Sequence, residues 1–268
     1  MLGHRLFFDF QSAHQVWGAT RGKPNKKLGR RCFGGVNALD FDSVSQVIER
    51  INPEIIVNCV ALLNRLSGEE KKPLYSIAVN ALFPHRLALY CQLHETRLIH
   101  ISTDCVFSGK NGNYDEFDFA DGDDLYGRTK YLGEVHNQPK CLTLRTSFIG
   151  RELKLDGGSL LEWFLRQEGL ASGYRLAYFS GLTTTEFSKI LIERVIPCYK
   201  MQGVFHVSGP RISKYELLFL IKQTFGKKIE IVPNNEVKID RSLSATRFNN
   251  YTGYQPPDWE QMLHEMAY

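Results

Sequence analysis

The segment Tyr126-Gly127-Arg128-Thr129-Lys130 places a tyrosine and a lysine four residues apart. On a helix this spacing puts both side chains on one face, so that the ammonium of Lys130 can lie near the phenol of Tyr126. A nearby cation favours the phenolate and lowers a pKa that is ordinarily about 10. Such a pair is suited to passing a proton to a carbonyl oxygen. The plain alternative is a pair on a helix surface.

A second cluster of polar residues lies upstream of this pair. Residues 97–101 have the apolar composition of a buried strand, and Ser102, Thr103 and Asp104 follow at its carboxyl end. Open α/β sheets place their chemistry at this edge. We therefore expect the Thr103 hydroxyl to hold the oxygen that receives the proton. Asp104 is expected either to contact substrate or to cap the following turn.

Strand and helix patterns alternate along the chain. Strands are expected at residues 15–20, 54–59, 98–102 and 141–145, and helices at residues 43–51, 76–93 and around Tyr126. Such alternation implies right-handed crossovers and a parallel, doubly wound sheet, an α/β fold. We predict a dinucleotide-binding Rossmann domain over residues 1–150. A smaller mixed α/β substrate-binding lobe over residues 151–268 is expected to interleave with it, with helices at 159–167 and 214–225 and a strand at 203–207.

Composition narrows the class of protein. The 268 residues are 43% hydrophobic and 23% charged with a net charge of +4, which is typical of a globular protein and gives no sign of a nucleic-acid partner. No apolar run has membrane-spanning length, and no signal peptide is apparent. The six cysteines show no metal-ligand spacing, so we expect no metal site and a reduced, cytoplasmic setting. Four histidines without a partner at catalytic spacing are interpreted as core or surface residues: His85, His94, His100 and His206.

The beginning of the chain departs from the usual dinucleotide fold. Such folds open with a central strand and a glycine-rich turn whose N–H groups hold the pyrophosphate. Here Gly3 has the place of the last glycine of that turn, and the strand before it is not apparent. If that strand is lacking, its neighbours expose unpaired edges and NADPH is bound weakly. The alternative is that Gly3 is merely a terminal residue.

These motifs together resemble the dTDP-4-dehydrorhamnose reductase family, which are extended short-chain dehydrogenases/reductases. The resemblance covers essentially the whole chain and rests above all on Ser-Thr-Asp-Cys-Val-Phe at residues 102–107 combined with residues 126–130. It implies NADPH-dependent reduction of the 4-keto group of a nucleotide-activated deoxysugar, in the synthesis of cell-surface polysaccharide precursors. Cys105 and residues 148–150 depart from the family pattern near the sugar pocket. The reaction type is therefore carried over more firmly than the particular sugar.

The resemblance also implies roles for single residues at the site of chemistry. Tyr126 would protonate the developing alkoxide, Thr103 would orient the keto oxygen, and Asp104 is a candidate substrate contact. Lys130 would hydrogen-bond the nicotinamide ribose and depress the pKa of Tyr126. Candidate contacts to the nucleotide diphosphate and the substrate are Arg145, Arg241, Lys214 and Tyr215, with helix-end electrostatics as the alternative for Lys214.

Cofactor contacts are expected along the amino-terminal strands. Those matched to the family are Gly3 at the pyrophosphate, Asp40 and Phe41 on the adenine side, and Val60 with Ala61 along the cofactor. At the end of the first expected strand the chain offers Arg21 where an acidic residue would mark NAD. A guanidinium can grip a 2′-phosphate through two charge-assisted hydrogen bonds, so NADPH is favoured and NADH is the alternative. Arg21 in a solvated loop is the simpler interpretation.

Two other functions compete with the reductase. A non-catalytic NADP-binding regulatory subunit like the methionine adenosyltransferase beta subunit shares this fold, and a nucleotide-sugar epimerase uses the same tyrosine and lysine with NAD. Thr103, Tyr126 and Lys130 favour catalysis, and Arg21 counts against the epimerase. The expected partner is a nucleotide-linked 4-keto sugar, and a homodimer is an arrangement open to the chain.

Overall fold

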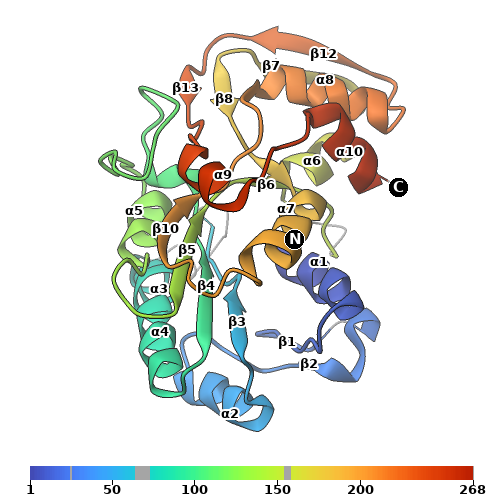
Figure 1. Ribbon diagram of the computed structural model, residues 1–268. Coiled ribbons are helices and arrows are strands. Elements are labelled where there is room, and N and C mark those ends of the chain that lie inside the picture. The colour runs from blue at the N-terminus through green and yellow to red at the C-terminus, as the bar shows by residue number, and fades with distance from the viewer. Residues whose placement is uncertain (25, 64–72, 154–157, 268) are drawn as a thin grey trace.

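A parallel sheet with helices on both faces forms the centre of the molecule. The computed structural model describes residues 1–24, 26–63, 73–153 and 158–267. The sheet has four strands in the order β10-β5-β4-β3, and Figure 1 shows α3, α4 and α5 on one side of it with α1 and α7 on the other. These strands are Gly203–His206, Cys141–Arg145, Arg97–Ile101 and Ile55–Asn58, respectively. The predicted doubly wound α/β fold is confirmed.

The apolar runs of the central strands supply both halves of the core. In β4, Leu98 packs into a cluster with the helices α2 (Phe41–Ile51) and α4 (Phe83–Leu93). Its neighbour Ile99 packs into the main core on the opposite face, which includes α1 (Leu2–Asp9). Every residue of β4 and β5 is buried, as expected for parallel strands covered on both sides. These strands form the rigid base of the site.

The amino-terminal strands are short and form a sheet of their own. A strand was expected at residues 15–20, but β1 comprises only Gly18–Ala19 and pairs in parallel with β2, Cys32–Phe33. Within the described chain, β3 pairs only with β4, and three of its four residues are half-buried. A two-stranded pair is marginally stable, so little holds β1 in an extended form beyond the residues that face β2.

The helix expected over residues 76–93 is interrupted. It consists of α3 (Pro73–Ser76), a π-helical turn η4 (Ile77–Leu82) and α4. Within η4 the buried Asn80 accepts a hydrogen bond from the Leu62 amide at 2.8 Å and donates to the Leu62 carbonyl at 2.9 Å. Asn80 thus bridges two segments of backbone, and π turns of this kind commonly occur beside functional sites.

The carboxyl-terminal region interleaves with the main sheet, because β10 pairs with β5. The division into domains at residue 150 stays a prediction. In the upper part of Figure 1, β12 pairs with β7, and β8 lies between β11 and β13. The strands of this region are β6 (Phe148–Ile149), β7 (Gly169–Tyr174), β8 (Ala177–Phe179), β9 (Leu182–Thr183), β11 (Ile212–Ser213), β12 (Ile229–Asn234) and β13 (Ile239–Asp240). Its helices are α6 (Leu160–Arg166), α7 (Thr184–Ile190), α8 (Lys214–Thr224), α9 (Thr246–Thr252) and α10 (Trp259–Ala267).

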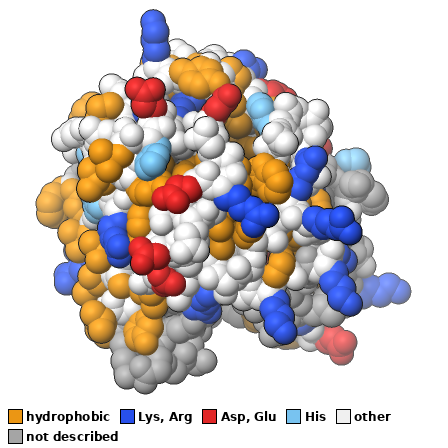
Figure 2. Space-filling view, turned by 90° about the horizontal axis from the view of Figure 1, so that it is seen from below, with side chains coloured by type: hydrophobic (Ala, Val, Ile, Leu, Met, Phe, Trp, Pro, Cys, Tyr) orange, Lys and Arg blue, Asp and Glu red, His pale blue; other side chains and the backbone are white. Residues whose placement is uncertain are grey.

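The surface seen from below carries basic side chains on the side where β1 and β2 lie (Figure 2). The loop between these strands contains exposed Lys26, Lys27, Arg30 and Arg31 around the short helix η2, Lys26–Arg31. Among the helices that the structure describes, none has the length and apolarity needed to cross a membrane.

Candidate active site

The Tyr126 phenol and the Thr103 hydroxyl meet at the carboxyl edge of the sheet. Thr103 caps the short helix η5 (Asp104–Val106), where its hydroxyl accepts a hydrogen bond from the Cys105 amide at 3.2 Å. Helix α5 (Leu125–Leu132) packs against this turn closely enough that a Cβ at Gly127 would overlap the Cys105 carbonyl oxygen. This approach lets the Tyr126 phenol hydrogen-bond the Thr103 side chain.

The electrostatic setting of Tyr126 differs from the one expected from the sequence. The pKa of its phenol is raised, first because burial disfavours the phenolate and also because the negative charge of Asp104 repels it. The bond to Thr103 acts in the opposite direction. Lys130 is not among the groups that chiefly set this pKa, and its amino group donates instead to the Ile101 carbonyl.

Lys130 is almost fully buried, and its amino group points to the end of β4. Its Nζ donates to the Ile101 carbonyl at 2.7 Å and lies 3.4 Å from Nε2 of His100. Burial lowers the pKa of Lys130 to about 8, while the negative charge of Glu134 favours the ammonium. The lysine is therefore closer to losing its proton at physiological pH than an exposed lysine is.

Asp104 lies where two basic side chains of the carboxyl-terminal lobe meet the site. Its carboxylate accepts a hydrogen bond from the Thr103 hydroxyl at 3.2 Å. Burial raises the pKa of Asp104, and the positive charges of Lys214 and Arg241 oppose this rise. Arg241 donates from Nε to the Phe107 carbonyl at 3.0 Å and from Nη1 to the Cys105 sulfur at 3.4 Å. The lobe thus supplies positive charge beside Thr103.

Arg145 does not take the place predicted for it at the nucleotide diphosphate. Only 2% of this residue is exposed, and its guanidinium makes two hydrogen bonds to Glu134, at 2.9 and 2.8 Å. Its Nη1 donates to Nε2 of His206 at 3.2 Å. The buried Glu134 also accepts from the Ser102 hydroxyl at 2.7 Å, so Arg145 joins β5 to the end of β4. The guanidinium is committed to this internal ion pair.

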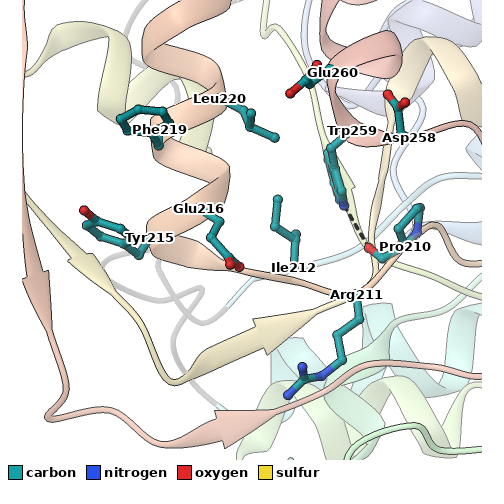
Figure 3. Close-up of a pocket in the computed structure, with 10 residues that line it drawn as sticks. All are labelled: Pro210, Arg211, Ile212, Tyr215, Glu216, Phe219, Leu220, Asp258, Trp259 and Glu260. Carbon is teal, nitrogen blue, oxygen red and sulfur yellow. Dashed lines mark hydrogen bonds between the residues drawn. The ribbon is translucent and has the colours of Figure 1, made fainter.

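Lys214 and Tyr215 begin the same helix but face different surroundings. Nζ of Lys214 lies 3.4 Å from the centre of the Phe179 ring, on the side of Asp104. Tyr215 lines a separate pocket of about 730 Å³ between α8 and the start of α10, where the Trp259 indole donates to the Pro210 carbonyl (Figure 3). Of the two, Lys214 is the residue beside the proposed chemistry.

Residues matched to cofactor binding gather at the carboxyl end of β3. A Cβ at Gly3, in the first turn of α1, would lie 3.7 Å from that of Cys59. Val60 and Ala61 follow as exposed residues. The chain amino terminus is near enough for its charge to act on Cys59. A helix amino end beside exposed backbone is an arrangement that suits a phosphate group.

The other candidate cofactor residues lie further along the same half of the chain. Arg21 is exposed just beyond β1, and Asp40 is exposed as the cap residue of α2. The Phe41 ring is instead packed edge-on against Phe83 and Tyr90, in the core beside α4. This packing gives Phe41 a structural role, whereas Arg21 and Asp40 present their side chains outward.

One neighbour of the site was not anticipated. His100, interpreted from the sequence as a core or surface residue, is fully buried with one ring nitrogen toward Lys130 and the other 3.0 Å from the Asn58 amide nitrogen. Its position within the apolar run that precedes Thr103 was the available signal, because a polar side chain inside a buried strand needs a partner.

Sequence comparisons match this chain to a protein family and to curated relatives. The family model described as RmlD substrate binding domain matches residues 1–268. A probable low-salt glycan biosynthesis reductase from Haloferax volcanii is 36% identical over 78% of this chain and 70% of its own length. A dTDP-4-dehydrorhamnose reductase from Aggregatibacter actinomycetemcomitans is 28% identical over 86% of both chains. The beta subunit of methionine adenosyltransferase 2 from Danio rerio is 29% identical over 84% of this chain and 71% of its own.

Solved structures share the fold. A hypothetical dTDP-4-dehydrorhamnose reductase from Sulfolobus tokodaii superposes with a TM-score of 0.79, covering 96% of this chain and 94% of its own at 23% identity. A dTDP-4-dehydrorhamnose reductase from Bacillus anthracis, crystallised in complex with NADP, gives a TM-score of 0.74 at 23% identity, covering 91% of this chain and 92% of its own.

Proposed function

We propose that this chain, which belongs to the RmlD substrate binding domain family, is an NADPH-dependent reductase of the 4-keto group of a nucleotide-activated deoxysugar. The observation that carries the proposal is the Tyr126 phenol beside the Thr103 side chain, with the Lys130 amino group at the end of the same strand, β4. The names of two relatives, a glycan biosynthesis reductase and a dTDP-4-dehydrorhamnose reductase, support a sugar substrate.

The proton is supplied by Tyr126 in this proposal. Because burial and nearby negative charge raise the pKa of its phenol, Tyr126 stays protonated at neutral pH and is a donor ready for an alkoxide. Thr103 already contacts the phenol and holds the keto oxygen at the same point. Lys130, once its ammonium turns toward the phenol, favours release of the proton.

The cofactor would be held by the amino-terminal half. Gly3 at the start of α1 and the exposed Val60 and Ala61 suit the pyrophosphate, and Arg21 suits a 2′-phosphate. When bound, the reduced nicotinamide supplies the hydride. Solved neighbours were crystallised with NADP and with NAD, so the choice of NADPH over NADH rests on Arg21.

The substrate would be placed by the carboxyl-terminal lobe. Arg241 and Lys214 bring two positive charges to the edge of the sheet beside Asp104, which suits an anionic nucleotide sugar. Arg145 is left out of the substrate contacts because it is bound to Glu134. Removing one of these charges tests the assignment. Arg241→Gln should raise KM for the sugar more than it lowers kcat.

Tyr126→Phe is the decisive variant. Oxidation of NADPH is followed by absorbance with a panel of dTDP- and UDP-linked 4-keto sugars. Loss of a general acid should reduce kcat by roughly 10²- to 10⁴-fold. Tyr131→Phe, on the same helix with a part-exposed ring, is the matched control and should retain turnover. Turnover by Tyr126→Phe at the wild-type rate would exclude the proposed acid.

The regulatory-subunit alternative is favoured by one specific observation. Beta subunits of methionine adenosyltransferase 2 match this chain over 84% of its length, at 29% identity for the Danio rerio protein. If NADPH binds but every sugar in the panel is inert, the result supports that alternative and overturns the reductase.

A further inference from the structure

The buried polar side chains beside Lys130 form a directed chain of hydrogen bonds. Asn58 and His100 are register partners on the parallel strands β3 and β4. Asn58, His100 and Lys130 expose 3%, 0% and 1% of their surface, so each must satisfy its polar atoms within the protein.

The direction of this chain starts from the backbone. The Val60 amide donates to Oδ1 of Asn58 at 3.1 Å, which fixes the carboxamide so that its NH₂ group faces the imidazole. The Asn58 Nδ2 then lies 3.0 Å from Nδ1 of His100. Because an NH₂ group only donates, Nδ1 must be the unprotonated nitrogen of the ring, and the imidazole carries its single proton on Nε2.

That proton points to Lys130, whose Nζ lies 3.4 Å from Nε2. Nζ also donates to the Ile101 carbonyl at 2.7 Å. An ammonium has three N–H donors and no acceptor, so it cannot accept a hydrogen bond from the Nε2–H. A neutral amine has a lone pair that accepts this bond. We propose that Asn58 holds His100 as the Nε2–H tautomer, and that this N–H stabilises the neutral amine of Lys130 relative to the ammonium.

The groups around Lys130 and His100 act in both senses. Glu134 beyond α5 favours the Lys130 ammonium, Cys59 at the end of β3 acts in the same direction, and His85 from α4 acts on His100. Burial and the charge of Lys130 hold the pKa of His100 well below its usual range, so the ring stays neutral. The lowered pKa of Lys130, about 8, has burial as its first cause, and the direction of the hydrogen bond acts in the same sense.

A second buried histidine has the opposite arrangement. His206 directs Nδ1 to the Tyr114 carbonyl at 3.1 Å, and a carbonyl only accepts. Its Nε2 lies 3.2 Å from Nη1 of Arg145, which only donates. His206 must therefore be the Nδ1–H tautomer. The protein thus contains its own reference for the tautomer that we exclude at His100.

His100 is in this view a positioning residue that sets the proton affinity of Lys130. Its meaning for catalysis rests on the proposed reductase, because only there does Lys130 act on Tyr126. A lysine that starts partly neutral can take up a proton as the cofactor binds, so proton uptake and cofactor binding would be linked.

The tautomer is measured by long-range ¹H–¹⁵N NMR of the full chain labelled in histidine. At pH 7 we expect His100 to be protonated at Nε2 and His206 at Nδ1, with the His100 signals identified by their loss in His100→Gln. A His100 ring protonated at Nδ1, or at both nitrogens, overturns the proposal. This result is obtained on the wild-type chain, so it does not depend on how a variant folds.

The effect on Lys130 is measured by titrating lysine labelled with ¹³C at Cε, with Lys130→Met identifying the signal. Asn58→Asp keeps the size of the side chain but replaces the NH₂ by an acceptor, so it should move the His100 proton to Nδ1 and raise the Lys130 midpoint by at least one pH unit, a tenfold change in proton affinity. Asn58→Leu removes the donor without adding charge and should give a smaller rise.

The two measurements distinguish the effect of the His100 tautomer on Lys130 from the effect of the negative charge that Asn58→Asp adds. A higher midpoint in Asn58→Asp with His100 still protonated at Nε2 would reflect charge alone and overturn the proposal, as would a switched tautomer with no rise. Neither measurement needs turnover, so inactivity toward every sugar would leave this inference intact. A wrong tautomer would equally leave the reductase intact.

Discussion

The two halves of the nucleotide-binding region differ in how completely they are built. Strands β4 and β5 are buried at every residue and lead into Thr103 and the Arg145–Glu134 pair. Strands β1 and β2 have two residues each and form a separate sheet. Within the described chain, β3 therefore pairs with β4 alone. The contrast teaches that the residues proposed for catalysis follow fully paired strands, whereas those matched to the cofactor are held by less backbone pairing.

The largest expected effect tests where the stability of the molecule lies. Arg145→Met leaves Glu134 buried without its ionic partner and should reduce the free energy of unfolding by about 3–5 kcal/mol. Arg5→Met, which breaks the part-exposed Arg5–Asp9 pair of α1, is the matched control and should cost about 0–1 kcal/mol. Urea unfolding of both variants measures the two values. Equal costs would show that the contrast between the halves does not extend to stability.

A second test concerns the open edge of β3. An apolar strand with a glycine-rich turn, about ten residues added before Met1, should pair with β3 and strengthen NADPH binding more than tenfold. A flexible Gly/Ser extension of equal length is the control, because it cannot supply an apolar strand. Calorimetry measures the dissociation constants, and unfolding midpoints should rise only with the strand. Equal affinities of the two extended chains would remove the link between strand pairing and cofactor binding.

Predictability from the sequence follows the same contrast. The strand expected at residues 141–145 is β5, because a run buried on both faces is mostly apolar and its length can be read from the sequence. The strand expected at residues 15–20 contracts to Gly18–Ala19, because its extent depends on pairing with β2 and not on its own composition. Local pattern therefore predicts the central strands better than the outer ones.

The arrangement of the candidate site residues was predictable from sequence where it depends on local motifs, and not where it depends on partners distant in the chain. Thr103 and Tyr126 lie on two motifs whose spacing is informative by itself. Arg145 at a strand end has the same sequence signal whether it binds a substrate or an internal carboxylate. In the structure it binds the internal carboxylate of Glu134. His100 depends on Asn58, 42 residues earlier, and on Lys130, 30 residues later. The local sequence indicates that this buried histidine needs a partner, but not which residues supply it.

Cofactor selectivity tests whether the less completed half still recognises its ligand. Arg21→Ala should lower the efficiency with NADPH roughly tenfold and leave NADH unaffected, because only NADPH carries the 2′-phosphate that a guanidinium can bind. Lys23→Ala, two residues on in the same exposed loop, should have a smaller effect. Steady-state kinetics with both cofactors give the ratio. An unchanged ratio in Arg21→Ala would assign the arginine to the solvated loop.

The smallest expected effect concerns the cost of burying Lys130 in the more complete half. Because its pKa falls to about 8 in the folded chain, against about 10.4 for an unperturbed lysine, the unfolded chain binds more protons between these pH values. Stability conferred by this residue should therefore rise with pH through that window, by at most about 1.4 kcal/mol per pH unit. Urea unfolding of wild type and Lys130→Met is compared at pH 8.5 and 9.5, each within roughly that window. The comparison gives the contribution of Lys130 to the free energy of unfolding, because the other titrating groups are common to both chains. A difference between the two chains that stays constant with pH would mean that the buried amine titrates as it does in water.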